Sequence, residues 1–285
     1  METMRKIPVL AVPIVMVLVL ALVLAGCGGG GSSGSATGTS GSGSTSQANT
    51  SSSETKSVWE TIRETGIITV GNSPDYEPFE FEDGQGNVVG FDIDLLGLIC
   101  EELGIEYELV NLAFENIETA VQTGQVNIGM SCFSITPERE QTFDFTIPYF
   151  SGGQAIAVNP DSGIETIADL VGKTITAGMG TSGMEAAEEH IPDADVIGME
   201  HYALAFMQLK SQGCDAAVAD LPVVRKYAER DGFVVLDEIL SYEDNAILVR
   251  KGNDDLLAAL NSAIQSLKDD GRIDGLVEHW LAGEG

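Results

Sequence analysis

Residues 131–150 read SCFSITPEREQTFDFTIPYF, and the elements around this stretch decide the fold. Thr136 followed by proline is a good helix start, so a short helix is predicted to carry Arg139 in its first turn. A helix N-terminus bears about half a positive elementary charge, which disfavours a guanidinium there unless an anion is shared with main-chain N–H groups. Arg139 therefore binds a small carboxylate, or it pairs on the surface with a nearby acid. The nearby acids are Glu138, Glu140 and Asp144.

Predicted strands alternate with helices of about ten residues on both sides of this stretch. Strands are predicted at 67–70, 105–110 and 126–130, and the pattern repeats from a strand at 154–158, with a helix at 164–171. Such alternation indicates α/β units with mostly parallel sheets. Ligands of such sheets bind outside the carboxyl ends of the strands, which is where the quoted stretch begins.

The first 26 residues are predicted to be an export signal. Two basic residues precede a charge-free apolar run, 7–26, which ends in Leu-Ala-Gly directly before Cys27. This order is typical of a signal peptide, although a run of this length could also remain as a membrane anchor. The tetrapeptide ending at Cys27 resembles the bacterial lipobox, which implies cleavage before Cys27 and lipidation of its thiol. Residues 28–53, of which 22 of 26 are Gly, Ser or Thr, are predicted to form a flexible tether.

The chain is strongly acidic, with 44 Asp and Glu against 14 Lys and Arg and a formal charge of −30. This argues against nucleic-acid binding, which depends on clustered Lys and Arg. Apart from Cys27, the cysteines are Cys100, Cys132 and Cys214, without metal or redox spacing. A disulfide framework is not expected, although a single bridge among them stays open.

A glycine-rich loop, Gly178-x-Gly180-x-x-Gly183, matches a dinucleotide fingerprint between a strand and a helix. NAD is not expected, because the chain is predicted to be exported and the loop lies midway along it. The loop still allows close main-chain approach, and the helix after it offers N–H groups to an anion such as a carboxylate, or only to water. We predict no cofactor and no metal.

Five motifs resemble the family-3 extracellular solute-binding proteins, the polar amino-acid-binding proteins of ABC importers. Their common order, over essentially all of residues 57–282, makes the resemblance specific. The motifs are Tyr76–Phe79 (YEPF), Gly90–Leu95 (GFDIDL), Ser134–Arg139 (SITPER), Asp144–Tyr149 (DFTIPY) and Asp169–Lys173 (DLVGK).

The resemblance implies an α/β, two-lobe periplasmic-binding-protein fold of type II with two hinge strands. Lobe 1 would comprise residues 57–151 plus 245–285, and lobe 2 residues 152–244. The signal peptide, residues 1–26, and the lipidated tether, residues 27–56, would precede them.

The resemblance also implies which residues hold the head group of an amino acid. Arg139 would bind the α-carboxylate, helped across the cleft by the main-chain N–H groups of Thr181 and Ser182. Asp220 would take the α-ammonium, because charge-assisted hydrogen bonds are the strong ones. Alternatively, Asp220 only caps the helix that begins at Leu221.

Four further residues are assigned to the head group and the ligand side chain. Ser134 and the Ser131 carbonyl would lie near the ammonium, and Tyr76 and Phe114 would sandwich the side chain. The two aromatics could also be ordinary core residues. Two acids in the second motif, Asp92 and Asp94, are expected to be structural and to cap the helix they precede.

Two departures from the family bear on specificity. Ser73 stands where binders of basic amino acids usually have an Asp, so an uncharged or polar amino acid is weakly favoured. Cys132 stands where the family often has Ser or Gly, and is expected to be a small buried thiol rather than a reactive one.

The predicted protein is thus a monomeric, non-enzymatic receptor on the extracytoplasmic face of the cell membrane, anchored at Cys27. It would capture a free amino acid and deliver it to an ABC permease. The main alternative is an exported dehydratase-type enzyme on the same fold that acts on a small carboxylate. A sensory or adhesive surface protein is a third possibility.

Overall fold

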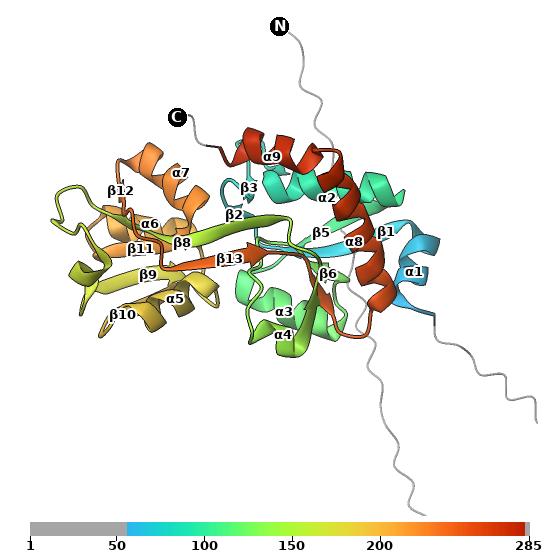
Figure 1. The fold of residues 1–285 in the computed structure, drawn as a ribbon, viewed down its shortest axis with the longest axis horizontal. Helices are drawn as coiled ribbons and strands as arrows, with labels where there is room; N and C mark the ends of the chain where they lie inside the picture. Colours follow the sequence, from blue (N-terminus) through green and yellow to red (C-terminus); the bar gives the residue numbers. More distant parts are fainter. Residues whose placement is uncertain (1–55, 283–285) are drawn as a thin grey trace, which may run out of the picture. The chain divides into compact units, whose positions relative to one another are not determined.

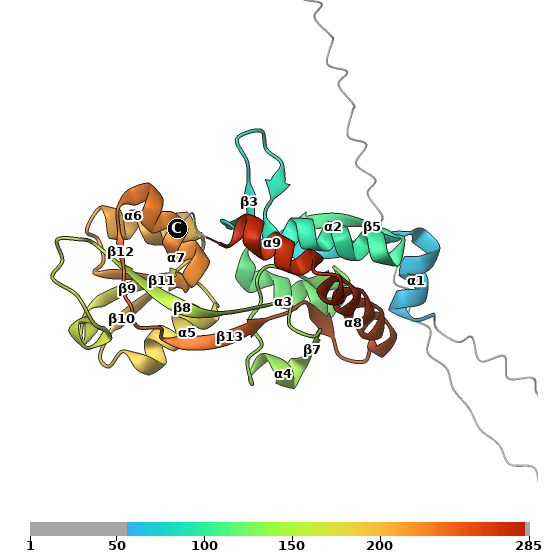
Figure 2. The ribbon, with the colours of Figure 1, turned by 45° about the horizontal axis from the view of Figure 1, so that its top comes forward.

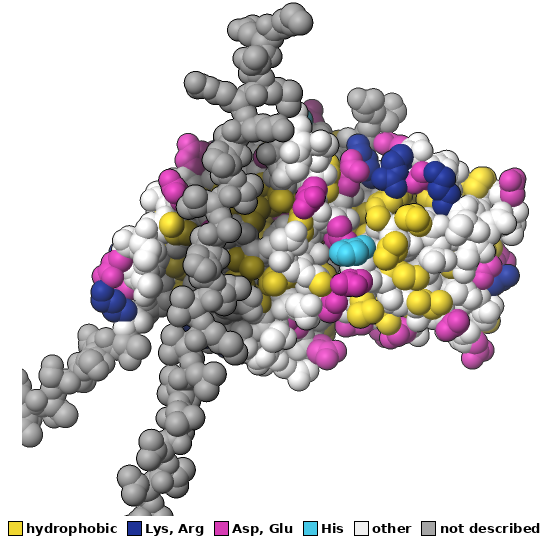
Figure 3. Space-filling view, turned by 180° about the vertical axis from the view of Figure 1, so that it is seen from behind, with side chains coloured by type: hydrophobic (Ala, Val, Ile, Leu, Met, Phe, Trp, Pro, Cys, Tyr) yellow, Lys and Arg dark blue, Asp and Glu magenta, His cyan; other side chains and the backbone are white. Residues whose placement is uncertain are grey.

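The computed structural model describes residues 56–282, which form two α/β lobes (Figure 1). The predicted signal peptide, Cys27 and nearly all of the tether lie outside these residues. Within the described residues, no helix has the length and apolar character needed to cross a bilayer. Acidic side chains are spread over the visible face of the molecule, as the composition predicts (Figure 3).

Lobe 1 is built on a five-stranded sheet. Its strands, in spatial order, are β5 (Glu106–Asn111), β1 (Ile67–Asn72), β6 (Ile128–Gly129), β14 (Leu248–Arg250) and β7 (Phe143–Phe145). The first three are parallel, and β14 runs antiparallel to both of its neighbours. The helices of this lobe are α1 (Val58–Thr65), α2 (Phe91–Leu103), α3 (Phe114–Thr123), α4 (Arg139–Thr142), α8 (Asp254–Asp269) and α9 (Arg272–Trp280). A small sheet beside them contains β2 (Asp75–Tyr76), β3 (Glu80–Glu82) and β4 (Val88–Val89).

The sequence explains where these elements start and what they bury. Helix α1 begins at a complete capping box, in which the Ser57 hydroxyl accepts the Glu60 N–H and the Glu60 carboxylate accepts the Ser57 N–H. In α2, apolar residues at helical spacing, including Leu95 and Ile99, are fully buried. Burial of these faces places β1 and β6 inside the lobe, with their carboxyl ends at its edge.

Lobe 2 is built on a second sheet. Its strands, in spatial order, are β10 (Asp195–Met199), β9 (Thr174–Gly178), β11 (Ala216–Asp220), β8 (Phe150–Val158) and β12 (Val234–Val235), with β13 (Ser241–Asn245) also paired to β8. Its helices are the 3₁₀ helix η1 (Ile167–Leu170), α5 (Ser182–His190), α6 (Tyr202–Lys210) and α7 (Leu221–Asp231). The helix predicted at 164–171 is thus wrong in type and length, because only one 3₁₀ turn forms there.

Two long strands, β8 and β13, run side by side from one lobe to the other (Figures 1 and 2). They pair antiparallel from Gln154 opposite Ser241 to Phe150 opposite Asn245. These are the two hinge strands of the expected fold. The strand predicted at 154–158 begins four residues earlier than expected, because Phe150–Gly153 pairs with β13, whose polar sequence gave no strand signal.

Candidate ligand-binding site

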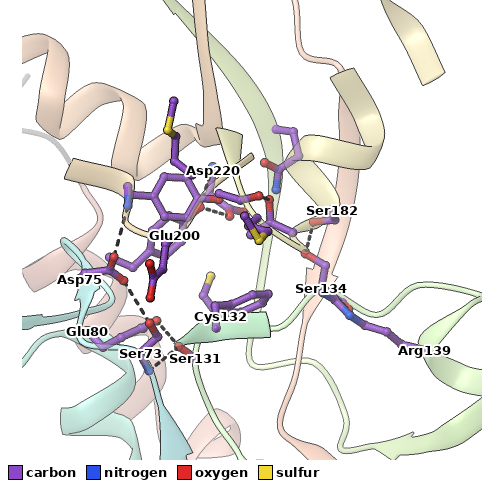
Figure 4. Close-up of a pocket in the computed structure, with 18 residues that line it drawn as sticks. Ser73, Asp75, Glu80, Ser131, Cys132, Ser134, Arg139, Ser182, Glu200 and Asp220 are labelled. Atoms are coloured by element: carbon purple, nitrogen blue, oxygen red, sulfur yellow. Dashed lines mark hydrogen bonds between the residues drawn. The ribbon is translucent and has the colours of Figure 1, made fainter. Parts of the chain in front are cut away.

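One cavity between the lobes is lined by all ten residues predicted to bind ligand (Figure 4). The space between its lining atoms is about 470 Å³, part of which is open to solvent. Lobe 1 contributes Ser73, Tyr76, Phe114, Ser131, Cys132, Ser134 and Arg139, and lobe 2 contributes Thr181, Ser182 and Asp220.

Arg139 begins the short helix α4, and its side chain is buried, with 6% of its surface exposed. Its main-chain N–H donates to the Thr136 hydroxyl at 3.3 Å. The N-cap position of α4 is Glu138, so the helix begins two residues later than the predicted start at Thr136. Its Nε donates to Glu118 at 2.8 Å, and its guanidinium also lies over the rings of Phe114 and Phe133. Surface pairing with its sequence neighbours is therefore wrong, because the acid that pairs with Arg139 comes from helix α3.

One terminal nitrogen of Arg139 bonds within lobe 1, and the other bonds to lobe 2. Nη1 donates to the Ser134 carbonyl at 3.1 Å, and Nη2 donates to the Gly180 carbonyl of lobe 2 at 3.0 Å. A guanidinium has five N–H donors, and these two bonds and the Nε bond use three of them. One donor remains on each terminal nitrogen, so the guanidinium still has donors for a carboxylate.

Asp220 ends strand β11, directly before helix α7, and its residue is 4% exposed. Its Oδ2 accepts the Tyr76 hydroxyl at 2.5 Å, and its N–H donates to the same hydroxyl oxygen at 2.9 Å. Its side chain makes no capping bond to α7, so the capping alternative is wrong. Its Oδ1 is buried and has no partner among the described residues. Burial raises the pKa of Asp220 to about 6, although the Tyr76 hydrogen bond acts in the opposite direction.

The glycine-rich loop lies between β9 and α5. The Thr181 hydroxyl accepts the Met184 N–H at 3.3 Å and so caps α5, and the Ser182 hydroxyl lies 2.9 Å from that of Ser134 across the cleft. The Ser182 N–H belongs to the first turn of α5, where N–H groups have no partner within the helix. A Cβ at Gly178 would lie 2.5 Å from the Tyr202 ring, so packing of the protein itself requires this glycine.

The two predicted aromatics face the cavity and also pack on neighbouring rings. The ring centroids of Tyr76 and Tyr202 are 4.4 Å apart, and those of Phe114 and Phe133 are 4.6 Å apart. Tyr76 thus packs in the core and also lines the cavity, and its hydroxyl bonds to Asp220 of lobe 2.

A chain of hydrogen bonds holds the floor of the cavity in lobe 1. The Ser73 N–H donates to the Ser131 hydroxyl at 3.1 Å, which in turn donates to Glu80 at 2.7 Å. The Cys132 N–H donates to Asp92 Oδ2 at 2.8 Å. Asp92 therefore lies inside α2 and supports the floor, and the expectation that it caps this helix is wrong. Asp94 also lies inside α2, where it accepts the indole N–H of Trp280 at the end of helix α9.

The three cysteines of the described residues are buried and free, so none of them forms a disulfide. Burial raises the pKa of Cys132 well above its usual value, and the surrounding carboxylates act in the same direction. Since the thiolate is the reactive form, Cys132 behaves as the small buried thiol that the sequence favoured.

Sequence reasoning missed three acidic residues that line the same cavity: Asp75, Glu80 and Glu200. Asp75 and Glu80 flank the YEPF motif, and Glu200 directly follows a strand at its carboxyl end, where ligands bind. These positions, next to a motif and at the end of a strand, are the features of the sequence that could have indicated a role in the site. Asp75 Oδ1 accepts the Ser73 hydroxyl at 3.2 Å, so a carboxylate lies next to position 73, where this chain has Ser in place of the usual Asp.

Residues 68–283 match the model of the bacterial extracellular solute-binding proteins, family 3. The arginine-binding extracellular protein ArtP of Bacillus subtilis strain 168 is 30% identical over 223 residues, which cover 76% of this chain and 87% of ArtP. The L-cystine-binding protein TcyJ of Escherichia coli strain K12 is 29% identical over 229 residues, covering 78% and 85% of the two chains.

Among solved structures, similarity extends to the ancestral amino acid-binding protein AncCDT-1, a precursor of cyclohexadienyl dehydratase. Its sequence is 37% identical and its TM-score is 0.73, with 78% of this chain and 98% of that chain covered.

Proposed function

Because the chain belongs to family 3 of the bacterial extracellular solute-binding proteins, we propose that it captures a free α-amino acid in its cleft and delivers it to the permease of an ABC importer. One observation carries the proposal. Arg139 on lobe 1 and Asp220 on lobe 2 line the same cavity as fixed charges of opposite sign. An α-amino acid presents one carboxylate and one ammonium close together, and so matches this pair.

The contacts suggest a role for each group. The ligand carboxylate would take the two remaining N–H donors of Arg139, together with the Ser182 N–H at the start of α5. The ligand ammonium would bind the open oxygen of Asp220. Since the ligand would touch both lobes, it would stabilise only the closed arrangement, which the lobes reach by bending at the hinge strands β8 and β13.

The proposal includes a lipid anchor at Cys27 on the extracytoplasmic face of the membrane, with the protein acting as a monomer. The lipobox-like tetrapeptide and the Gly/Ser/Thr-rich segment after it support this placement. A Cys27→Ser variant should lose lipid labelling and leave the membrane fraction. Retention of this variant in the membrane would contradict the anchor.

A thermal-shift screen of the full-length protein in detergent against all common amino acids tests the function. We expect a subset of amino acids to raise the melting temperature, because a ligand at 100 times its Kd stabilises the folded state by about 2.7 kcal/mol. If no amino acid shifts the transition, the proposed function is wrong.

A second candidate is a dehydratase-type enzyme, favoured by the raised pKa of Asp220, which suits a general acid near neutral pH. AncCDT-1 is itself named an amino acid-binding protein, and its name also makes it a precursor of a dehydratase. Mass spectrometry of small hydroxy-carboxylates incubated with the protein tests it, because each dehydration lowers the substrate mass by one water. If the substrates stay unchanged and amino acids stabilise the protein, the dehydratase candidate is wrong and the transport function is the one that remains.

A further inference from the structure

More acidic side chains line the cavity than the head group of an amino acid can pair with. Four carboxylates line it, from Asp75, Glu80, Glu200 and Asp220, against one guanidinium, from Arg139. A zwitterionic head group brings one charge of each sign, so its binding leaves this imbalance unchanged. The remaining positive charge must come from another part of the ligand.

Glu80 is a buried acid in this cavity that lacks a positively charged partner in the described part of the chain. Its residue is 1% exposed, at the start of β3, and its Oε1 accepts the Ser131 hydroxyl at 2.7 Å. Its Oε2 is buried without a partner among the described residues. A buried carboxylate with an open oxygen costs free energy until a cation or donor reaches it. Burial, and next the charge of Asp92, raise the pKa of Glu80 well above its usual value. A cationic group beside Glu80 would lower this pKa and favour the carboxylate form.

The three additional acids lie apart from the site of the ligand carboxylate. Figure 4 shows Asp75, Glu80 and Glu200 on the side of the cavity away from Arg139. Asp75 reaches lobe 2, where its Oδ2 lies 3.1 Å from His201 Nδ1 and accepts the Tyr202 N–H at 3.2 Å. Carboxylates from both lobes therefore surround the place where a ligand side chain would extend.

We propose that Asp75, Glu80 and Glu200 form a side-chain subsite for the cationic end of a basic amino acid, which rests on the proposed amino-acid-binding function. A guanidinium or ammonium would donate to the open oxygen of Glu80 and be shared with the other two acids. This reverses the weak preference for an uncharged ligand, which depended on Ser73 alone. A metal ion is a poorer occupant, because the described residues contain no group of His, Cys, Asp and Glu placed to hold one.

Isothermal titration of the full-length protein in detergent with matched ligands tests the subsite. Arginine and citrulline have nearly the same shape, but only arginine is charged, and lysine and norleucine form a second pair. We expect each basic ligand to bind at least about tenfold more tightly than its neutral partner, because an unpaired buried charge is strongly penalised. Equal or tighter binding of citrulline and norleucine would overturn the subsite and leave the proposed function intact.

The variant Glu80→Gln tests whether the preference for a basic ligand depends on the charge of Glu80. It should weaken arginine binding at least about tenfold and citrulline binding by a much smaller factor, so that the preference for arginine decreases, because only the charge is removed. Glu82→Gln, in the same strand but exposed, is the matched control and should change neither. If Glu80→Gln does not fold, Glu200→Gln at the exposed rim tests the same subsite, with a smaller loss for arginine alone.

Three outcomes contradict the subsite in different ways. A Glu80→Gln variant that binds arginine as tightly as wild type would overturn it. So would stabilisation of the protein by calcium or sodium ions in place of a basic amino acid. If neither basic nor neutral amino acids bind wild type, the proposed function fails as well.

Discussion

Arg139 and Asp220 are both buried and line the same cavity, but their surroundings differ. Arg139 donates to three protein acceptors, one of them the carboxylate of Glu118. Asp220 faces no basic side chain within hydrogen-bonding distance among the described residues, and one of its oxygens has no partner. The cation is therefore held in place before a ligand arrives, whereas the anion depends on the ligand for its counter-charge.

This difference has a thermodynamic consequence. A paired cation can be prepositioned without destabilising the folded protein, but an unpaired buried carboxylate destabilises it. Removal of each charge should therefore have opposite effects on the stability of the ligand-free protein. The following experiments separate the two groups, beginning with the largest effect.

Arg139→Ala should abolish the amino-acid-induced rise in melting temperature. Loss of one partner of a buried, hydrogen-bonded charge pair costs about 2–5 kcal/mol of binding free energy. The ligand-free melting temperature should also fall by several degrees, because Glu118 and two carbonyls lose their donor, at about 2–4 °C per kcal/mol for a domain of this size. Differential scanning fluorimetry measures both quantities.

The exposed Arg225→Ala is the control and should change neither quantity. Arg139→Lys keeps the charge but loses the planar fork, so it should bind at least about tenfold more weakly than wild type. An Arg139→Ala variant that amino acids stabilise as much as wild type would show that the carboxylate binds elsewhere.

Asp220→Asn should weaken binding and yet stabilise the ligand-free protein above pH 6. The folded-state pKa of Asp220 is about 6, against an ordinary value of 3.8 for an aspartate. The folded state therefore binds more protons than the unfolded state between these values, and its stability decreases as pH rises through this window. A difference of about two pKa units corresponds to about 3 kcal/mol of folding stability, which wild type loses as Asp220 ionises. The uncharged amide of Asp220→Asn does not ionise, so the variant keeps this stability.

The melting temperatures of wild type and Asp220→Asn, measured from pH 4 to pH 8 without ligand, test this expectation. The advantage of the variant should be smallest at pH 4 and should grow by several degrees toward pH 8. Asp237→Asn, at an exposed position of lobe 2, should follow wild type throughout. A constant difference across this range would mean that Asp220 does not titrate as its burial requires.

Tyr76→Phe should have the smallest effect of the three. It removes the hydroxyl that bonds both the carboxylate and the N–H of Asp220 across the cleft, and retains the ring that packs on Tyr202. We expect amino-acid affinity to fall by about tenfold, the value of one or two hydrogen bonds, in isothermal titration. Tyr242→Phe is the control, since Tyr242 is 83% exposed. If both variants bind like wild type, the Tyr76 bridge does not contribute to ligand capture.

The sequence could predict the residues of the cavity better than their partners. Ser134, Arg139 and Tyr76 stand inside recognisable motifs, and the structure brings them to one cavity. The partner of Arg139 is Glu118, which comes from a separate helix, α3, and becomes its neighbour only through the packing of the lobe. No local pattern contains that information.

The elements that were missed depend on tertiary contacts in the same way. The sequence of β13, SYEDN, has no apolar alternation and becomes a strand because β8 offers it a partner. Glu80 faces the cavity because β3 pairs with β2 in a particular register, with Tyr76 opposite Glu80. The acidic lining of the cavity near Ser73 therefore could not be predicted from the residue at position 73 alone.

The order in which the chain crosses between the lobes bears on how this protein could be made into a sensor. The first and last described helices, α1 and α9, both pack in lobe 1, while lobe 2 is inserted between β7 and β14. Reporters fused beyond these two helices would stay together when the hinge bends and would show no signal. A fluorophore placed on the outer face of α6, paired with one after α9, would change its separation with each ligand captured.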